Sequence, residues 1–177
     1  MTRYAALLRG VNVNGITIKS ADLKALFVEL GFDEVRTVLA SGNVLFNAVG
    51  RGAAKLKARI EKALRERFDY DAWIVLVTQA KLAKVLAAYP FPRQDDELQP
   101  YVVFGSDRAA LAELMSKAKP VLDDAIERLQ AGAGVLYWQV PRGRSTETPV
   151  ARLCAKPRYK AAITTRNLRT VEKLAQD

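Results

Sequence analysis

The order in which strand and helix patterns follow one another is the feature that most constrains the fold of this chain. An apolar run at residues 3–9 predicts a buried strand, and it is followed by four apolar residues at the spacing i, i+3, i+4, i+7, namely Leu23, Leu26, Phe27 and Leu30. That spacing predicts a helix over residues 20–30, with Ser20 as its N-cap. Two strands joined by the hairpin signal Ser41-Gly42, a second helix and a last strand follow at residues 35–40, 43–47, 52–68 and 71–77. The order strand–helix–strand–strand–helix–strand is that of a ferredoxin-like half.

The second half of the chain partly repeats this order. Thr78 and Ser106-Asp107 are typical helix starts, and alternation predicts strands at residues 101–105 and 134–141. Further helices are predicted from Pro120 through Leu129, over residues 149–156 and over residues 165–176. The stretch YAALLRG…ADLKALFVEL also resembles YVVFGSDRAALAELM, which indicates an internal duplication.

We therefore expect an α+β fold of two packed ferredoxin-like (βαββαβ-type) subdomains, with mostly antiparallel sheets and helices on one face. The expected N-terminal ferredoxin-like subdomain spans residues 1–78. The remainder, residues 79–177, is expected to form a C-terminal α+β subdomain with basic C-terminal helices.

Composition favours a protein of the reducing cytoplasm. Half of the 177 residues are hydrophobic, which is enough for a sizeable core, and no apolar run approaches the roughly 18 residues that span a bilayer. The first ten residues, MTRYAALLRG, have a charge within their apolar run and are interpreted as the first strand rather than a signal peptide. Cys154 is the only cysteine, so no internal disulfide and no thiolate metal site is expected.

The chain contains no histidine, which excludes several kinds of chemistry. A Ser-His-Asp triad, a Cys-His pair and a histidine-ligated metal all require that residue. We expect no metal and no cofactor, and a protein that is more plausibly a binding module than an enzyme.

The net charge of +9 is unevenly distributed. Residues 1–78 carry 12 basic and 8 acidic side chains, residues 79–141 carry 7 and 8, and residues 142–177 carry 9 and 3, so the last segment has a net charge of +6. Such an excess favours polyanions, namely nucleic acid or a phosphorylated ligand. The alternative is a generic basic surface without a specific partner.

The loop after the first strand, GVNVNGIT at residues 10–17, is compared first with a phosphate-binding P-loop. Ile16 occupies the position of the P-loop lysine, so an NTPase is rejected. Glycine backbone groups could still hold an anion, with side-chain donors from the flanking and loop residues Arg9, Asn12, Asn14 and Lys19. The alternative is a strand-to-helix connection whose asparagines satisfy local backbone groups.

Two basic segments near the C-terminus are further candidates. In ITTRNLRTVEKL, residues 163–174, Thr164 or Thr165 is predicted to cap a helix, which places Arg166 and Asn167 in its first turn. Arginine there opposes the helix dipole unless an anion binds, and the alternative is a carboxylate elsewhere that pairs with Arg166. Arg144, in the glycine-containing stretch PRGRSTET, lies either in a phosphate-binding loop or at a solvated hairpin end.

Three stretches, YAALLRGVNVNG, ADLKALFVELGFDEVRTVLASGNVLF and TTRNLRTVEKLA, resemble the bacterial domain-of-unknown-function 1697 family. The likeness runs in order over nearly the whole chain, with Asn14 and Leu168 departing from the usual pattern. The resemblance implies a small cytoplasmic protein with two ferredoxin-like subdomains. It implies no catalytic residues, because the family has no established reaction or ligand.

Strand ends and helix starts meet at one edge of a ferredoxin-like sheet, so we expect one anion-binding face built from these loops. Its phosphate contacts are expected to be Arg9, Lys19, Arg144 and Arg166. Its ligand-orienting and hydrogen-bonding residues are expected to be Asn12, Asn14, Ser41, Asn43, Thr165 and Asn167. The alternatives are an enzyme that acts on a small phosphorylated or acidic metabolite and a protein-interaction domain.

Overall fold

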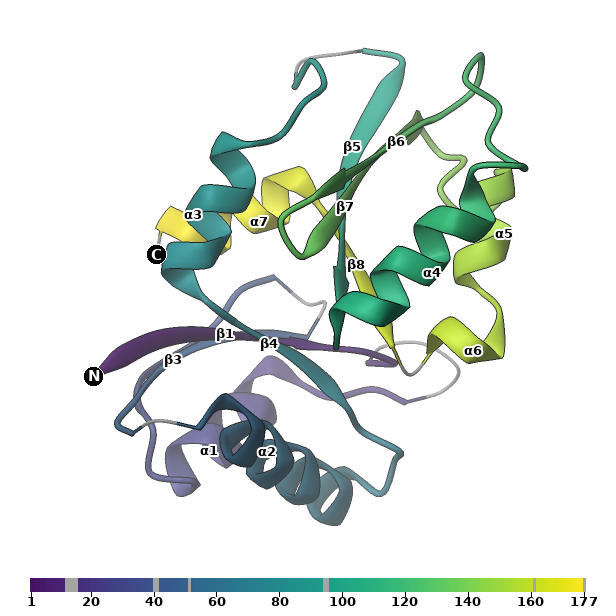
Figure 1. The fold of residues 1–177 in the computed structure, drawn as a ribbon. Helices are drawn as coiled ribbons and strands as arrows, with labels where there is room; N and C mark the ends of the chain where they lie inside the picture. The colour runs from purple at the N-terminus through teal and green to yellow at the C-terminus, as the bar shows by residue number, and fades with distance from the viewer. Residues whose placement is uncertain (12–15, 40–41, 51, 94–95, 161, 177) are drawn as a thin grey trace. The chain divides into compact units, whose positions relative to one another are not determined.

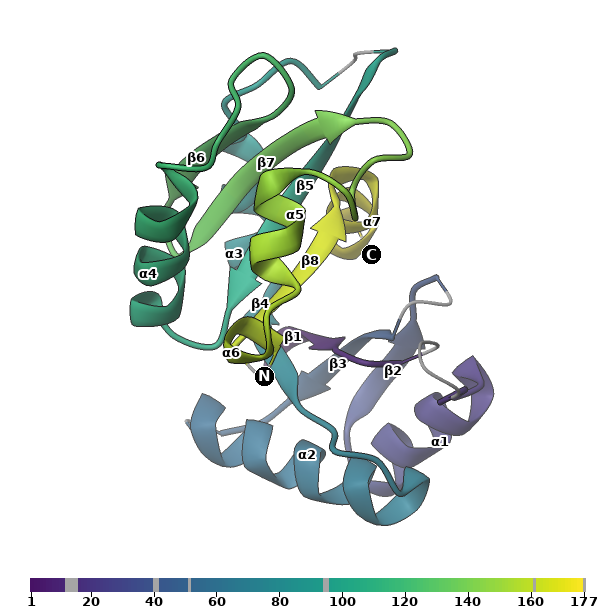
Figure 2. The ribbon, with the colours of Figure 1, turned by 90° about the vertical axis from the view of Figure 1, so that its right-hand side faces the viewer.

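The structure is a computed structural model that describes residues 1–11, 16–39, 42–50, 52–93, 96–160 and 162–176. The chain divides into two compact units, each with its own sheet (Figures 1 and 2). The first unit contains Met1–Ala83 and Glu172–Asp177, and the second contains Lys84–Val171.

The first unit has the predicted strand and helix order. Its elements are β1 (Thr2–Leu8), α1 (Ser20–Glu29), β2 (Asp33–Thr37), β3 (Asn43–Ala48), α2 (Ala53–Phe68) and β4 (Ile74–Thr78), after which α3 (Gln79–Ala87) begins. The strands form one sheet in the order β2-β3-β1-β4, in which all neighbours are antiparallel. This order is the ferredoxin-like arrangement that the sequence predicts, and α1 and α2 lie side by side in Figure 1.

Aromatic side chains fill the core between this sheet and its helices. Alternate residues of β1 and β3 face α1 and α2, because side chains of a strand point to opposite faces in turn. Phe46 of β3 is completely buried and lies 4.6 Å from Phe32 and 5.2 Å from Phe27, measured between ring centroids. The α1 periodicity seen in the sequence therefore marks the face that packs on the sheet.

The second unit has the same topology. Its elements are β5 (Leu98–Gly105), α4 (Arg108–Ala118), β6 (Arg128–Gly132), β7 (Val135–Pro141), α5 (Pro149–Cys154), α6 (Pro157–Lys160) and β8 (Ile163–Asn167), followed by α7 (Leu168–Gln176). The antiparallel sheet has the order β6-β7-β5-β8. Since β5 to β8 are the first to fourth strands of this unit, the order is the same as β2-β3-β1-β4 in the first unit. The expected α+β fold with two ferredoxin-like subdomains is confirmed.

Strand register supports the internal duplication. Tyr4 of β1 pairs with Phe46 of β3, and Tyr101 of β5 pairs with Trp138 of β7. The two ring pairs have similar centroid distances, 5.8 Å and 5.4 Å. The two halves therefore place an aromatic pair at the same position of the same two central strands.

The helix predicted from Pro120 through Leu129 is wrong. The backbone turns in that stretch, where the Asp123 carboxylate accepts a hydrogen bond from the Ala125 N–H, and the edge strand β6 begins at Arg128. Leu129 pairs with Trp138 of β7 and is buried between exposed neighbours. Pairing with a distant strand determines the conformation of this segment, because its short apolar pattern is compatible with both a helix and a strand.

The helix predicted over residues 165–176 begins three residues later than expected. Residues 163–167 form β8, which pairs with β5, and α7 starts at Leu168. Thr165 and Arg166 are strand residues, so they do not form a helix N-terminus. The N-cap of α1 also differs from the prediction, since it is Lys19 and not Ser20.

Candidate functional sites

The end of β1 and Gly42, the residue before β3, lie together in the first unit. The Leu8 N–H donates a hydrogen bond to the Gly42 carbonyl at 2.8 Å. Gly42 has a φ of 69°, and a Cβ added there would lie 3.0 Å from the Leu8 Cβ, so this close approach requires glycine. Asn12, Asn14 and Ser41, which belong to the segments after β1 and before β3, lie outside the described residues.

Lys19 is the exposed one among the candidates of the first unit that the structure describes, since Arg9 is half-buried and Asn43 is buried. As the N-cap of α1, Lys19 has extended backbone and makes no side-chain cap hydrogen bond. The first N–H groups of a helix have no partner within the helix, and the dipole there is positive. Arg9 is half-buried, and its own N–H donates to the Trp73 carbonyl at 3.3 Å.

Asn43 is held inside the first unit. Its side chain is completely buried, and its Nδ2 donates to the Val38 carbonyl at 3.0 Å. The Val38 N–H in turn donates to the Asn43 carbonyl at 2.9 Å. These two bonds close the β2–β3 connection, which is a structural role for this residue.

The candidate residues of β8 make hydrogen bonds within the second unit. Arg166 is 9% exposed, and its guanidinium donates to Thr164 Oγ1 at 2.7 Å and to the Thr165 carbonyl at 3.0 Å. The half-buried Asn167 caps α7, because its Oδ1 accepts from the Arg169 N–H at 2.9 Å. The crowding of cations at a helix start, from which an anion site was inferred, is therefore absent at Arg166.

Arg144 is exposed and lies in the turn after β7. Its N–H donates to the Pro141 carbonyl at 3.0 Å, and its Nε lies 3.6 Å from a carboxylate oxygen of Glu147. An exposed ion pair of this length restrains an arginine only weakly. Arg144 thus remains accessible to an anion.

A group of cations on the helices of the second unit was not singled out from the sequence. Helices α4, α5 and α6 cover the sheet face that contains Val103, Leu136 and Trp138, and Figure 2 shows them on one side of the sheet. We call four exposed cations on these helices and in the turn between α5 and α6 the basic helical layer, which comprises Lys117, Arg152, Lys156 and Arg158. Residues 149–160 contain four basic and no acidic residues, and that run was the signal available in the sequence.

One ion pair ties α4 to α6 within this layer. The Arg158 guanidinium donates two hydrogen bonds to the Glu113 carboxylate, and the Tyr159 hydroxyl donates a third at 3.2 Å. The hydrogen bonds from Arg158 hold the pKa of Glu113 below its ordinary value of 4.5. Because a depressed carboxyl pKa stabilises the folded state only while the group is ionised, this contribution is present above the unfolded pKa and is lost as the pH falls through the folded pKa.

We expect Arg158→Ala to flatten the acid dependence of stability. The wild-type melting temperature should fall more between about pH 5 and about pH 3 than that of the variant, which has no ion pair to lose. Arg152→Ala is the matched control, because it removes the same charge from the neighbouring helix without touching Glu113. Thermal melts followed by circular dichroism would check this, and equal slopes for wild type and Arg158→Ala would contradict it.

The described residues provide neither a cluster of metal ligands nor a membrane-spanning helix. Among the residues that the structure describes, no group of three or more Asp, Glu, Cys or His side chains is arranged to hold a metal ion. Within the same ranges, no helix combines the length and the apolar character needed to cross a bilayer.

The fold and surface define the chain as a tandem ferredoxin-like α+β protein with a basic helical layer. It belongs to the family described as Protein of unknown function (DUF1697), whose model matches residues 1–137. Its structure is similar to that of the conserved bacterial protein SP0830 from Streptococcus pneumoniae, with 25% identity and a TM-score of 0.80 over 99% of this chain and 97% of that one. No curated protein matches the chain.

These comparisons confirm the family that the sequence motifs indicated. LRGVNV and SGNVLF lie within the matched residues, whereas TTRN lies beyond them. The family description names no reaction and no ligand.

Proposed function

We propose that this protein is a non-enzymatic binding module of the cytoplasm for a polyanion, with nucleic acid as the preferred partner. The observation that carries the proposal is the basic helical layer. Residues 149–160, which form α5, α6 and the turn between them, contain four basic residues and no acidic residue. Phosphate backbones are bound mainly by such accessible Lys and Arg side chains.

The availability of these cations distinguishes the layer from the equally basic helix α2. Most cations of α2 are occupied, because four of its six form ion pairs with carboxylates, namely Lys57, Lys62, Arg65 and Arg67. In contrast, the side chains of Arg152 and Lys156 make no hydrogen bond or ion pair with any residue in the described ranges, and Lys117 has only an electrostatic interaction with the Glu113 carboxylate. A free cation can exchange its counterions for a phosphate without first breaking an internal pair.

Three of the residues singled out from the sequence are proposed as additional phosphate contacts. Lys19 is supported by its exposure at the uncapped start of α1, and Arg144 by its weakly restrained side chain. Arg9 is proposed on its position directly after β1. The internal hydrogen bonds of Asn43, Arg166 and Asn167 give less support to direct ligand contacts by those side chains.

We expect the double variant Arg152→Ala/Lys156→Ala to bind nucleic acid more weakly and with a smaller salt dependence. If each side chain neutralises one phosphate, the slope of log K against log salt should decrease by about 2. Fluorescence anisotropy with labelled single-stranded DNA, duplex DNA and RNA over a salt series measures both quantities.

The control is Lys24→Ala/Lys81→Ala, which removes the same charge from exposed positions of α1 and α3. It should change affinity much less, because a general loss of positive charge acts only through the long-range field. Equal effects of the two double variants, or no binding by the wild type at low salt, would refute the proposal and favour a protein-interaction domain.

A further inference from the structure

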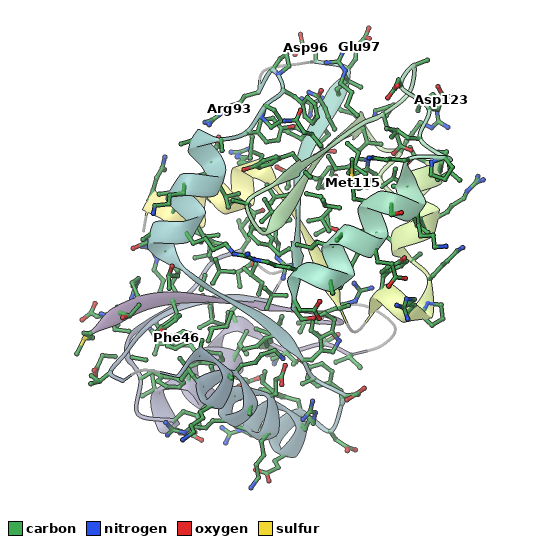
Figure 3. All side chains as sticks on the ribbon, viewed as in Figure 1. Phe46, Arg93, Asp96, Glu97, Met115 and Asp123 are labelled. Carbon is green, nitrogen blue, oxygen red and sulfur yellow. The ribbon has the colours of Figure 1, made fainter. Side chains whose placement is uncertain are left out.

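The second unit contains a groove on the side of its sheet that carries α4. It lies between one face of α4 and the β6–β7 hairpin and has a volume of about 620 Å³, within the range of small-molecule sites. Its walls are mostly apolar and include Leu111, Met115 and Leu136, with the small residues 131–134 at the hairpin tip. Met115 is labelled in Figure 3.

The internal duplication explains why the groove exists. Counted from the N-caps Lys19 and Asp107, Phe27 of α1 and Met115 of α4 are equivalent, since each lies eight residues further on. Phe27 is completely buried against Phe46, whereas Met115 is only partly buried. A smaller, flexible thioether thus replaces the aromatic ring that fills this position in the first unit.

The β6–β7 hairpin also contributes small residues to the groove. Gly134 has a φ of 75°, which favours glycine at this turn. The groove is therefore lined at this end by the small residues Ala131, Gly132, Ala133 and Gly134.

Charge at the two ends of the groove selects the kind of ligand. Arg108 and Lys119 line it and are exposed, and no Asp or Glu is among its lining residues. Neither side chain makes a hydrogen bond or ion pair with another residue of the described ranges. Arg108 is the first residue of α4 and Lys119 is its C-cap, eleven residues further on, so the two positions lie about 16 Å apart along the helix axis.

We propose that this groove binds an amphipathic carboxylic acid, with its hydrocarbon body on Met115 and its carboxylate paired with Arg108. Arg108 is favoured over Lys119 because a guanidinium can bind both carboxylate oxygens at once, whereas an ammonium acts as a point charge. The site shares no residue with the basic helical layer, so it does not rest on the proposed function.

Calorimetric titration of the full chain with decanoate tests the proposal, with decanol as the uncharged probe and acetate as the probe without a hydrocarbon body. Saturable binding of decanoate is expected, with decanol about tenfold weaker and acetate undetectable. Decanol binding as tightly as decanoate would overturn the assignment of an acid.

Two variants test the two halves of the site. Met115→Phe, which introduces the side chain of the first unit, should abolish decanoate binding and leave the melting temperature within a few degrees of wild type. Arg108→Gln should weaken binding about tenfold, whereas Arg128→Gln, which removes the same charge outside the groove, should not. If Met115→Phe unfolds the protein, the comparison of decanoate binding by Arg108→Gln and Arg128→Gln tests the proposal by itself.

Three further outcomes would overturn the proposal. Lys119→Gln should have a smaller effect than Arg108→Gln, and the reverse order would overturn the placement of the carboxylate. If sedimentation shows a dimer that decanoate dissociates, the groove is an interface between copies of this chain and the proposal is wrong. Unchanged decanoate binding by both Met115→Phe and Arg108→Gln would also overturn it.

Discussion

Phe46→Ala should reduce the free energy of unfolding of the first unit by about 3–5 kcal/mol, the range for truncating a buried phenylalanine. Phe46 is completely buried in β3 and is labelled in Figure 3. Its ring contacts Tyr4 on the neighbouring strand, Phe27 on α1 and Phe32 before β2, at centroid distances of 5.8, 5.2 and 4.6 Å. Removing it leaves a cavity bounded by three rigid rings, which cannot collapse fully into the space.

Urea denaturation followed by far-UV circular dichroism measures this loss. Val28→Ala is the control, because Val28 lies on the same helix as Phe27 but is 53% exposed. Its effect should stay within about 0.5 kcal/mol, as for most surface substitutions. A similar loss for both variants would mean that the aromatic cluster does not stabilise the first unit as described.

Glu127→Ala should destabilise the second unit by about 3 kcal/mol. Glu127 is 1% exposed; its Oε2 accepts a hydrogen bond from Trp138 Nε1 at 2.8 Å, and its Oε1 accepts one from the Val150 N–H at 3.0 Å. The alanine variant leaves both donors buried without this acceptor, and each unsatisfied group costs about 1–3 kcal/mol. It also removes a negative charge from the N-terminal turn of α5, where the helix dipole favours one.

Glu127→Gln separates these contributions. The amide retains an oxygen acceptor but directs an NH₂ group at the other donor, so an intermediate loss of stability is expected. Denaturation midpoints give the stability, and the NMR shift of the Trp138 indole proton reports whether its hydrogen bond persists. Glu66→Ala, at an exposed position, is the control, and a loss as small as that of the control would contradict a structural role for Glu127.

The first unit illustrates how far local patterns predict a fold. The periodicity of Leu23, Leu26 and Phe27 predicted α1, and these residues are buried against the sheet. Helix starts with a local capping hydrogen bond were also predictable, since Asp107 accepts from the Ala110 N–H and Thr78 from the Lys81 N–H. Such signals depend on residues three or four positions apart, which the sequence displays directly.

The candidate site was less predictable, because the role of a polar side chain depends on what surrounds it. The sequence identifies Asn43 and Arg166 as polar and basic, but their hydrogen bonds to Val38 and Thr164 arise from turn and strand geometry. Lys19 was chosen for its charge, and its lack of a cap bond became visible only with the helix start in place. The groove beside Met115 was unforeseen, because its volume depends on two elements that are distant in sequence.

The sequence by itself determined the family, the ferredoxin-like order of the first unit and the excess of cations near the C-terminus. Periodicity, caps and charge are properties of neighbouring residues, and they persist in any tertiary context. Only the tertiary structure decided that residues 128–132 and 163–167 are strands, that Arg166 is buried and that Arg152 and Lys156 lie accessible on one helical layer. The physical reason is that strand pairing and burial are long-range: β8 exists because Val102 and Val103 of β5 offer their hydrogen-bonding edge to residues more than sixty positions away.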